Sequence, residues 1–257
     1  MRRWIVLALV GVITVVVTAL ITAPARFLDK ALERATLGRV RLAEAAGTIW
    51  QGSGRLVFVD VSGAGEPGLT SAGVAVPGRL TWSVRPLPLL FGLVDATVST
   101  DGMAAPVRLQ GSFTELRIGP GSLSLPSVEL GRLGSPWNSV RPSGALAVQW
   151  QTLLVRQGQL TGQASIELRD MASAMTPVRP LGSYRIDIDG KGARADLAIE
   201  TLSGPLLLSG NGTWDARGGL RFVAQASAEP AEAARLQSFL GLLGRREGDH
   251  TTIKIGA

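Results

Sequence analysis

The residue types that perform most enzymatic chemistry are scarce in this chain. Cysteine is absent and histidine occurs once, as His250 between Asp249 and Thr251. A serine hydrolase would have to use this histidine, yet the sequence has no Gly-x-Ser-x-Gly turn of the kind that presents a nucleophilic serine. The lack of cysteine also excludes thiolate metal ligands, disulfides and a thiol nucleophile. We therefore expect no catalytic residue and no enzymatic activity.

Carboxylates are the remaining groups that could act in acid–base or metal chemistry. Residues 187–192 read Asp-Ile-Asp-Gly-Lys-Gly, which has the start of a calcium loop. The regularly spaced further oxygen ligands and the closing glutamate of such a loop are missing. An Asp-Gly dipeptide between alternating segments instead favours a tight hairpin turn, with a positive φ at Gly190. We expect Asp187, Asp189, Asp196 and Glu200 to lie on the faces of that hairpin, and we expect no metal and no cofactor.

The positive charge of the chain is spread rather than clustered. Lys and Arg number 26 against 20 Asp and Glu, which gives a net charge of +6, and only Lys30, Lys191 and Lys254 are lysines. Proteins that bind nucleic acid concentrate their cations in a patch, whereas here the arginines occur one at a time. A phosphate-binding Gly-x-x-x-x-Gly-Lys-Ser/Thr loop is also absent from the sequence. We expect neither nucleic acid nor a small-molecule substrate as a partner.

The elements that carry these residues begin with an apolar run. Trp4–Ala23 contains 20 positions without a charge, enough for a helix that spans a hydrocarbon core of about 30 Å. Ala23-Pro24-Ala25 resembles a signal-peptidase site, but the apolar core of a signal peptide is about 7–15 residues, shorter than this run. We therefore predict that residues 1–25 form a retained anchor with a short cytoplasmic N-terminus. Its lipid-facing residues include Trp4, Ile5, Leu7, Leu9, Val16 and Leu20.

The anchor is followed by a segment of helical periodicity. Residues 26–38 place Phe27, Leu28, Leu32 and two alanines at helical spacing, and Gly38 ends the pattern. This predicts a short juxtamembrane amphipathic helix. Such a helix could lie at the bilayer surface or pack on the following sheet, and the pattern fits both. Because basic residues flank the apolar run on both sides, charge alone does not decide the orientation of the anchor.

From Arg39 onward the hydrophobic period changes to two. Gly, Pro and Ser separate the alternating stretches at intervals of about 8–12 residues, which is typical of all-β domains. No regular alternation of strand and helix appears, so a doubly wound α/β fold is excluded. We predict a mainly β domain over residues 39–257, built as an extended antiparallel sheet or a sandwich. The expected strands are Arg39–Ala45, Arg55–Val61, Gly78–Val84, Leu93–Ser99, Val107–Phe113, Ala145–Gln151, Gln159–Leu168, Ser183–Asp189, Ala193–Thr201, Gly219–Ser227 and Thr251–Ile255.

One strong helix is expected near the end of the domain. Pro230 suits the first helical position, and Gly244 the stop. The stripe formed by Ala233, Leu236, Phe239, Leu240 and Leu243 predicts a C-terminal amphipathic helix that lies on the sheet as a lid. Arg245 and Arg246 would then face the negative end of its dipole.

Four tryptophans each follow a glycine and a short apolar stretch. They are Trp50, Trp82, Trp150 and Trp214. The glycines that start the second and third of these blocks lie 66 residues apart. This spacing indicates either two related halves, with a break near residues 130–145, or simply the frequent use of glycine at strand starts. We expect these tryptophans to pack at least partly against the β core rather than to form a ligand cage.

Three blocks of the chain resemble the type II secretion system protein N family (general secretion pathway protein N). They are Gly47-Thr-Ile-Trp-Gln-Gly-Ser-Gly54, Pro77-Gly-Arg-Leu-Thr-Trp82 with Pro86-Leu-Pro-Leu-Leu90, and Gly204-Pro-Leu-Leu-Leu-Ser-Gly-Asn-Gly-Thr-Trp214 with Leu240-Gly-Leu-Leu-Gly-Arg245. The order of these blocks extends the resemblance from the anchor to the tail, although the segment from Gly102 to Tyr184 matches by its β character alone. The motif residues, expected to be structural, are Gly47, Trp50, Gly52, Gly78, Trp82, Gly204, Pro205, Leu206, Gly210, Trp214, Leu240, Gly244 and Arg245.

The resemblance implies a single-span inner-membrane protein whose bulk lies in the periplasm. It would be a non-catalytic component of the Gram-negative apparatus that exports folded proteins. Its implied partners are other inner-membrane subunits or the outer-membrane channel, together with the lipid bilayer. The alternative is a lipid-handling β-groove protein like the AsmA group, which also begins with one anchor and a glycine–tryptophan strand. An open curved sheet lined with apolar side chains would suit lipid handling, and a closed sandwich would suit a scaffold.

Overall fold

The structure, a computed structural model, describes residues 18, 22–36, 38–59, 73–75, 78–129, 140–215 and 218–256. The anchor residues Trp4, Ile5, Leu7, Leu9, Val16 and Leu20 lie outside these ranges. Within them, no helix is both long and apolar enough to cross a membrane. The elements are α2 (Arg26–Ala35), β1 (Val40–Gly47), β2 (Gln51–Val59), β3 (Gly73–Ala75), β4 (Leu80–Val84), α3 (Pro86–Leu89), β5 (Leu93–Ser99), β6 (Val107–Ser112), β7 (Glu115–Ile118), β8 (Gly121–Glu129), β9 (Pro142–Trp150), β10 (Leu153–Arg156), β11 (Gln159–Ser173), β12 (Gly182–Gly192), β13 (Arg194–Ser203), β14 (Leu206–Asp215), β15 (Gly219–Ala228), α5 (Ala233–Leu243), β16 (Arg245–Glu247) and β17 (His250–Ile255).

All the strands belong to one antiparallel sheet that follows the chain like a meander. Strands β4, β5, β6 and β7 pair in chain order, as do β11 to β15. Two long strands are each divided into two parts. One consists of β7 and β8, which are joined by Gly119 and Pro120, and the other consists of β9 and β10. These two long strands are antiparallel neighbours, with β8 paired to β9 and β7 paired to β10. At the far end β17 lies between β15 and β16. The mainly β prediction is therefore confirmed, and the architecture is a single sheet rather than two packed sheets.

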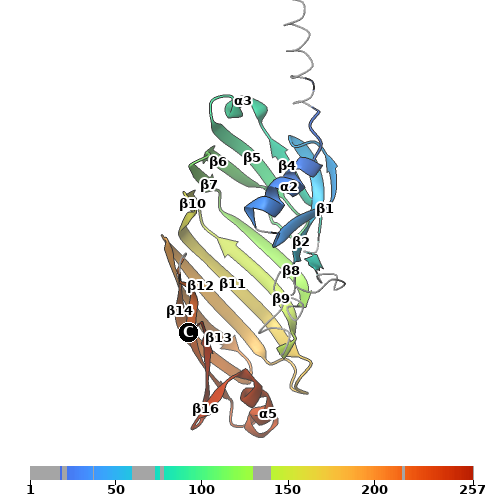
Figure 1. Ribbon diagram of the computed structural model, residues 1–257. Coiled ribbons are helices and arrows are strands. Elements are labelled where there is room, and N and C mark those ends of the chain that lie inside the picture. Colours follow the sequence, from blue (N-terminus) through green and yellow to red (C-terminus); the bar gives the residue numbers. More distant parts are fainter. Residues whose placement is uncertain are drawn as a thin grey trace, which may run out of the picture.

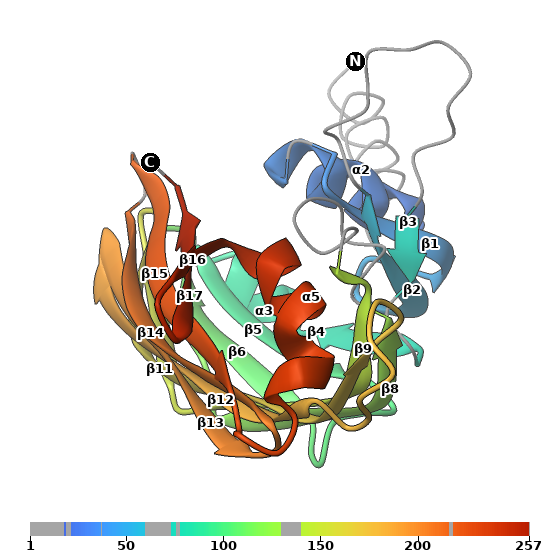
Figure 2. The same cartoon turned by 90° about the horizontal axis from the view of Figure 1, so that it is seen from below.

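The sheet is bent into an open trough. Figure 2 views it nearly along the strands and shows β11–β15 and β8–β9 forming the floor and walls, with α5 inside. Register shifts, at which one strand carries extra residues, occur in β1, β8 and β11. The shifts in β1 and β11 coincide with the positive φ angles of Glu44 and Asp170. Bulges of this kind bend the strand and increase its twist. Within the described residues, β1 and β16 do not pair, so the trough stays open.

The main hydrophobic core lies where α5 covers the trough floor. Leu236 and Phe239 of α5 are fully buried and pack with Met171, Tyr184 and Leu206 of the sheet. Burial raises the pKa of the Tyr184 hydroxyl well above its ordinary value, and this hydroxyl donates a hydrogen bond of 3.0 Å to the Leu206 carbonyl. The prediction of a helical lid on the sheet is confirmed.

A second, smaller core holds α2 against the start of the sheet. Ala25 and Leu42 are buried together with Trp82. The Leu42 N–H donates to Asp29 Oδ1 at 2.8 Å, and the same carboxylate is 3.5 Å from the Arg41 guanidinium. Of the two placements that the sequence allows, the structure shows α2 packed on the sheet (Figure 1).

Several local predictions were wrong in detail. Pro230 is not the first helical residue: α5 begins at Ala233, after a turn over residues 230–232. Arg245 and Arg246 do not end the helix but form β16. In the hairpin of β12 and β13 the positive φ is at Gly192, not at Gly190, because the ladder continues to the Gly190–Ala195 pair before the chain turns.

Candidate functional site

The concave face of the sheet carries the candidate site. Side chains directly opposite one another in an antiparallel sheet lie on the same face. One such cross-strand row contains Ala164, Ile188, Leu197, Gly212 and Phe222. The next row consists of Ile166, Ile186, Ile199, Gly210 and Ala224. These rows place an apolar surface on five consecutive strands.

The apolar surface continues onto β9 and β8. Ala164 is opposite Trp150, and Ile166 is opposite Val148. Trp150 is in turn opposite Gly121, and Val148 opposite Leu123. Because α5 packs on the row of Leu168, Tyr184 and Leu208, it covers one end of this face only. In the row of Ile166 and Ile186, Ile199 still packs against this core and Ala224 is buried. The row of Ala164, Ile188 and Leu197 lies beyond the helix and borders an open hollow.

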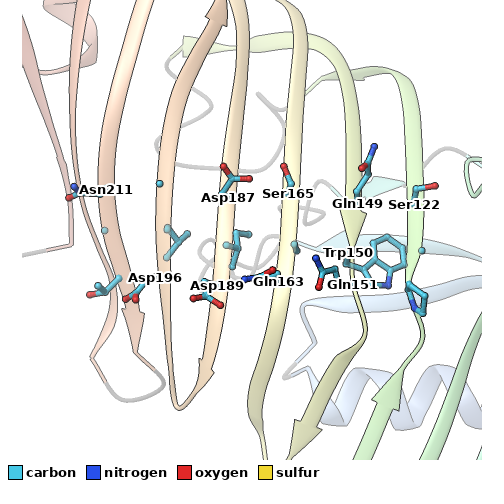
Figure 3. Close-up of a pocket in the computed structure, with 18 of the residues that line it drawn as sticks. Ser122, Gln149, Trp150, Gln151, Gln163, Ser165, Asp187, Asp189, Asp196 and Asn211 are labelled. Atoms are coloured by element: carbon cyan, nitrogen blue, oxygen red, sulfur yellow. The ribbon is translucent and has the colours of Figure 1, made fainter.

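The open part forms a hollow with a volume of about 1230 Å³, lined by β8, β9, β11, β12, β13 and β14. Ala104 and Ala105 close one side. In the close-up of Figure 3, Asp187 and Asp189 of β12 are labelled, and they stand before and after the floor residue Ile188 along the strand. The alternation of side chains along a strand directs these carboxylates to the opposite, convex face. The floor of the hollow is thus formed by the side chains of Trp150, Ile188 and Leu197. The residues before and after them in the strands contribute their backbone atoms to the lining.

The floor residues of β11 to β14 lie inside continuous ladders, with a paired strand on each side. A ligand in this hollow would therefore meet apolar side chains and few free hydrogen-bonding groups. Such a surface suits a hydrocarbon chain or the apolar side of an amphipathic segment, as α5 itself demonstrates at the covered end. It does not suit a sugar, a nucleotide or another strongly polar ligand, whose groups would be left unpaired.

The convex face carries ion pairs within strands and between neighbouring strands. Glu167 lies 2.6 Å from the Arg169 guanidinium and 3.1 Å from that of Arg185. Hydrogen bonds from Arg169 and then Arg185 lower the pKa of Glu167. On the neighbouring hairpin, Lys191 lies 2.7 Å from Asp196, and their hydrogen bond lowers the pKa of this carboxyl. Of the charged residues in the predicted hairpin, Asp196 and Glu200 thus form cross-strand pairs, with Lys191 and Arg185, and Asp189 pairs with Lys191 of its own strand.

The same arrangement recurs at the other end of the sheet. Arg108 forms a two-pronged contact with Asp95, at 3.1 and 3.0 Å. These hydrogen bonds lower the pKa of Asp95 and raise that of Arg108. In the part of the chain that the structure describes, no three His, Asp or Glu side chains are grouped as metal ligands. His250 begins β17, opposite Glu247.

The first two motif blocks of the sequence meet in space. Trp82 packs its indole ring over Gly52, where an added Cβ would lie 2.4 Å from the ring. The indole N–H donates to the Thr48 carbonyl at 3.1 Å. Gly47 has φ +89° at the end of β1, and Trp50 is half-buried in the turn between β1 and β2. Gly78, with φ +95°, precedes β4.

Trp150 repeats the arrangement of Trp82. Its ring covers Gly121, where a Cβ would lie 2.5 Å from the indole, and its N–H donates to the Gly119 carbonyl at 2.9 Å. In both cases the glycine is directly opposite the tryptophan in the register. The sequence did not single out Gly121, although its partner tryptophan was noted. This recurrence is what two related halves would produce; the division near residues 130–145 remains a prediction.

The third motif block forms the turn and strand beneath α5. Gly204 has φ +107°, and an added Cβ would lie 2.3 Å from the Gly182 Cα. The Pro205 carbonyl accepts a hydrogen bond from Glu229, and Leu206 is buried in the main core. Gly210 leaves room for the Ala224 side chain of β15.

The C-terminal part of this block surrounds the helix. Leu240 packs against the core at half burial, Gly244 ends α5 beside the Thr252 backbone, and Arg245 begins β16. Trp214 is the most exposed of the four motif tryptophans, with 39% of its surface exposed. It lies at the end of β14 farthest from α5.

Comparison with known proteins gives one match. A family model described as "Type II secretion system (T2SS), protein N" matches residues 38–253. This match runs from just before β1 into β17 and so covers essentially the whole sheet. No curated protein and no solved structure matches significantly.

Proposed function

The chain belongs to the type II secretion system protein N family, and we propose that it acts as a non-catalytic inner-membrane component of that secretion apparatus. In this role it contributes to the export of folded proteins from the periplasm through contacts with other subunits. The observation that carries the proposal is the extent of the family match, because it coincides with the sheet from end to end. The trough and its edges are then the surfaces available for contact.

We further propose that the protein is single-pass, with residues 39–257 in the periplasm. The charge-free run Trp4–Ala23 supports an anchor, and α2 follows it directly and is fixed to β1. The partners would be inner-membrane subunits or the outer-membrane channel. Among the described strands, β16 pairs with β17 alone and so offers the backbone groups of its other side, which is the requirement for adding a strand from another subunit.

A secretion assay in cells tests the proposal. A strain lacking the gene is complemented with the full chain, with a variant whose anchor is replaced by a cleavable signal, or with His250→Ala. Export of a folded substrate should be restored by the full chain and by His250→Ala, and reduced with the anchorless form. The role as a contact subunit would be refuted if His250→Ala stopped export while the anchorless form supported it fully.

In-cell crosslinking identifies the partners. A photoreactive residue placed on edge strand β16 should capture another subunit of the apparatus, whereas one on the convex face at Ala198 serves as control. Capture of no subunit from any edge or trough position, in cells that secrete normally, would contradict the contact role.

Lipid handling is the second candidate, and one observation favours it: the sheet is open, curved and apolar on its concave side. The test is whether the full chain, purified from membranes, retains phospholipid and crosslinks to a lipid with a photoreactive acyl chain. Ile188→Asp places a charge in the hollow, and Ala198→Asp places one on the convex face of the next strand. Lipid handling predicts that only the first substitution abolishes crosslinking; equal crosslinking in both variants rejects it.

A further inference from the structure

The most exposed apolar side chains gather in two turns. Leu87, Leu90 and Phe91, in the connection between β4 and β5, are 71%, 78% and 82% exposed, and Phe113, between β6 and β7, is 77% exposed. No other large apolar side chain in the described ranges is as exposed as these four. Isolated apolar residues are common on protein surfaces, but a cluster of this exposure marks a contact site.

The two turns are neighbours in the sheet. Leu93, the first residue of β5, pairs with Ser112, the last residue of β6. Phe113 therefore begins its turn beside the end of the 86–92 connection. We call Leu87, Leu90, Phe91 and Phe113 the apolar tip. Leu93, itself 50% exposed, lies at its base.

The backbone of the tip is suited to an apolar environment. Around α3 the N–H groups of Leu90, Phe91 and Gly92 donate to the carbonyls of Leu87, Pro88 and Leu89, at 3.0–3.2 Å. Pro86 and Pro88 have no N–H to satisfy. A segment that enters hydrocarbon must pair its own backbone groups, because lipid tails offer no hydrogen-bond partners. This turn largely meets that requirement.

The tip lies at the same end of the molecule as the close of the apolar N-terminal run. The Ile49 N–H donates to the Ala23 carbonyl at 2.9 Å, and the Val84 N–H donates to the Trp50 carbonyl at 2.6 Å. These two hydrogen bonds link Ala23, through the turn at residues 49–50, to Val84 at the end of β4, directly before the tip. Figure 1 shows α3 and the start of the described chain together at the top, far from α5.

Cations border this end. Arg26 and Lys30 of α2 are exposed. Arg85, at the base of the tip, pairs with Asp95 at 2.9 Å and still has 68% of its side chain exposed. Lys and Arg next to an inserted apolar segment interact favourably with anionic lipid headgroups. With the apolar tip in the hydrocarbon of a leaflet, these cations would lie at the level of its headgroups.

We propose that the apolar tip inserts into the leaflet facing the β domain, as a second bilayer contact beside the anchor. The inference rests on the proposed anchorage of residues 1–25 and goes beyond it, because it fixes how the domain stands on the membrane. With two contacts at one end, the trough extends away from the bilayer and the α5 end lies farthest from it.

The absence of cysteine in the sequence makes the proposal directly testable. Leu90→Cys and Phe91→Cys each give the full chain one thiol for an environment-sensitive fluorophore, and Leu242→Cys on α5, 56% exposed, is the matched control. The labelled chains are reconstituted into vesicles of phosphatidylethanolamine and phosphatidylglycerol, with or without acyl chains that carry a nitroxide quencher. Circular dichroism checks that each variant is folded.

The proposal predicts blue-shifted emission and strong quenching at positions 90 and 91, and neither at position 242. Water-exposed emission at all three positions, in protein that floats with the vesicles, would overturn the tip contact while leaving the anchor intact, and the tip would then be a surface for a protein partner. Failure of the full chain to float with vesicles at all would refute the anchor and the tip together. The vesicles contain no other subunit of the apparatus. The fluorescence result therefore does not depend on whether the protein takes part in secretion, and the two proposals can fail separately.

Discussion

Substitution of Trp82 by alanine tests whether the glycine–tryptophan contact is structural. The side chain is 8% exposed, covers Gly52 and donates a hydrogen bond to Thr48. Removing a buried tryptophan side chain costs about 3–5 kcal/mol of the free energy of unfolding. About 0.5–1.5 kcal/mol of that sum is the usual net contribution of one hydrogen bond.

The expected shift of the midpoint of thermal unfolding follows from the size of the chain. About 2–4 °C is lost per kcal/mol in domains of this size, so Trp82→Ala should lower Tm by about 6–20 °C. The measurement is the loss of the β-sheet circular dichroism signal on heating the full chain in micelles. Trp214→Ala is the control: the same residue type is removed, but from a site that is 39% exposed, so its effect should be clearly smaller.

Two results would refute the reasoning. If Trp82→Ala left Tm unchanged while weakening binding to a partner subunit, Trp82 would be a contact residue rather than a structural one. If Trp82→Ala and Trp214→Ala lowered Tm equally, burial would not explain the difference between the motifs.

Three further predictions concern other parts of the fold. Gly204→Ala should destabilise the protein by more than about 1 kcal/mol, since a side chain is disfavoured at its positive φ and its Cβ would meet the Gly182 backbone; Gly241→Ala, in open space on α5, should instead be neutral or stabilising by up to about 1 kcal/mol in urea unfolding. Phe239→Ala should cost about 3–5 kcal/mol and Leu242→Ala, on the exposed side of the same helix, less than about 1 kcal/mol; equal costs would contradict the lid. Because its arginine partners lower the pKa of Asp95 in the folded state, this carboxylate stabilises the fold above its ordinary pKa of 3.8 and the contribution disappears as the pH falls below that value. The Tm difference between the wild type and Asp95→Asn should therefore vanish in acid, and a difference that grew on acidification would show the opposite sign.

Strand content was predictable where side chains alternate cleanly. In residues 183–189 the alternation of Tyr184, Ile186 and Ile188 with charged residues identified β12, and the structure places these three side chains on one face. β8 was missed although Leu123 and Leu125 alternate with serines, because Pro126 breaks the alternation after Leu125, where the strand carries a register shift. Short β7 and β10 offer too few residues for a period to be recognised.

The hollow could be predicted only in part. Alternation tells which side chains share a face, so Ile188 and Leu197 could be grouped from the sequence. It does not tell how strongly the sheet bends, because curvature arises from the bulges in β8 and β11 and from small residues such as Gly210 and Gly212 on the inner face. The exposure of the apolar tip was likewise hidden, since residues 86–90 entered the sequence argument only as part of a motif.

The meander has a consequence for how the protein is made. Because nearly every ladder joins neighbours along the chain, the sequence separation of contacts is small for an all-β protein, and such topologies fold faster than those that must close long loops first. A chain that emerges from its N-terminus can therefore add each strand to the edge formed by the strand before it, without waiting for its own C-terminus. The last element to arrive is the hairpin of β16 and β17 with α5, which covers the inner face at that end. Until then the backbone groups of the growing edge are exposed, and an exposed edge can pair with another chain.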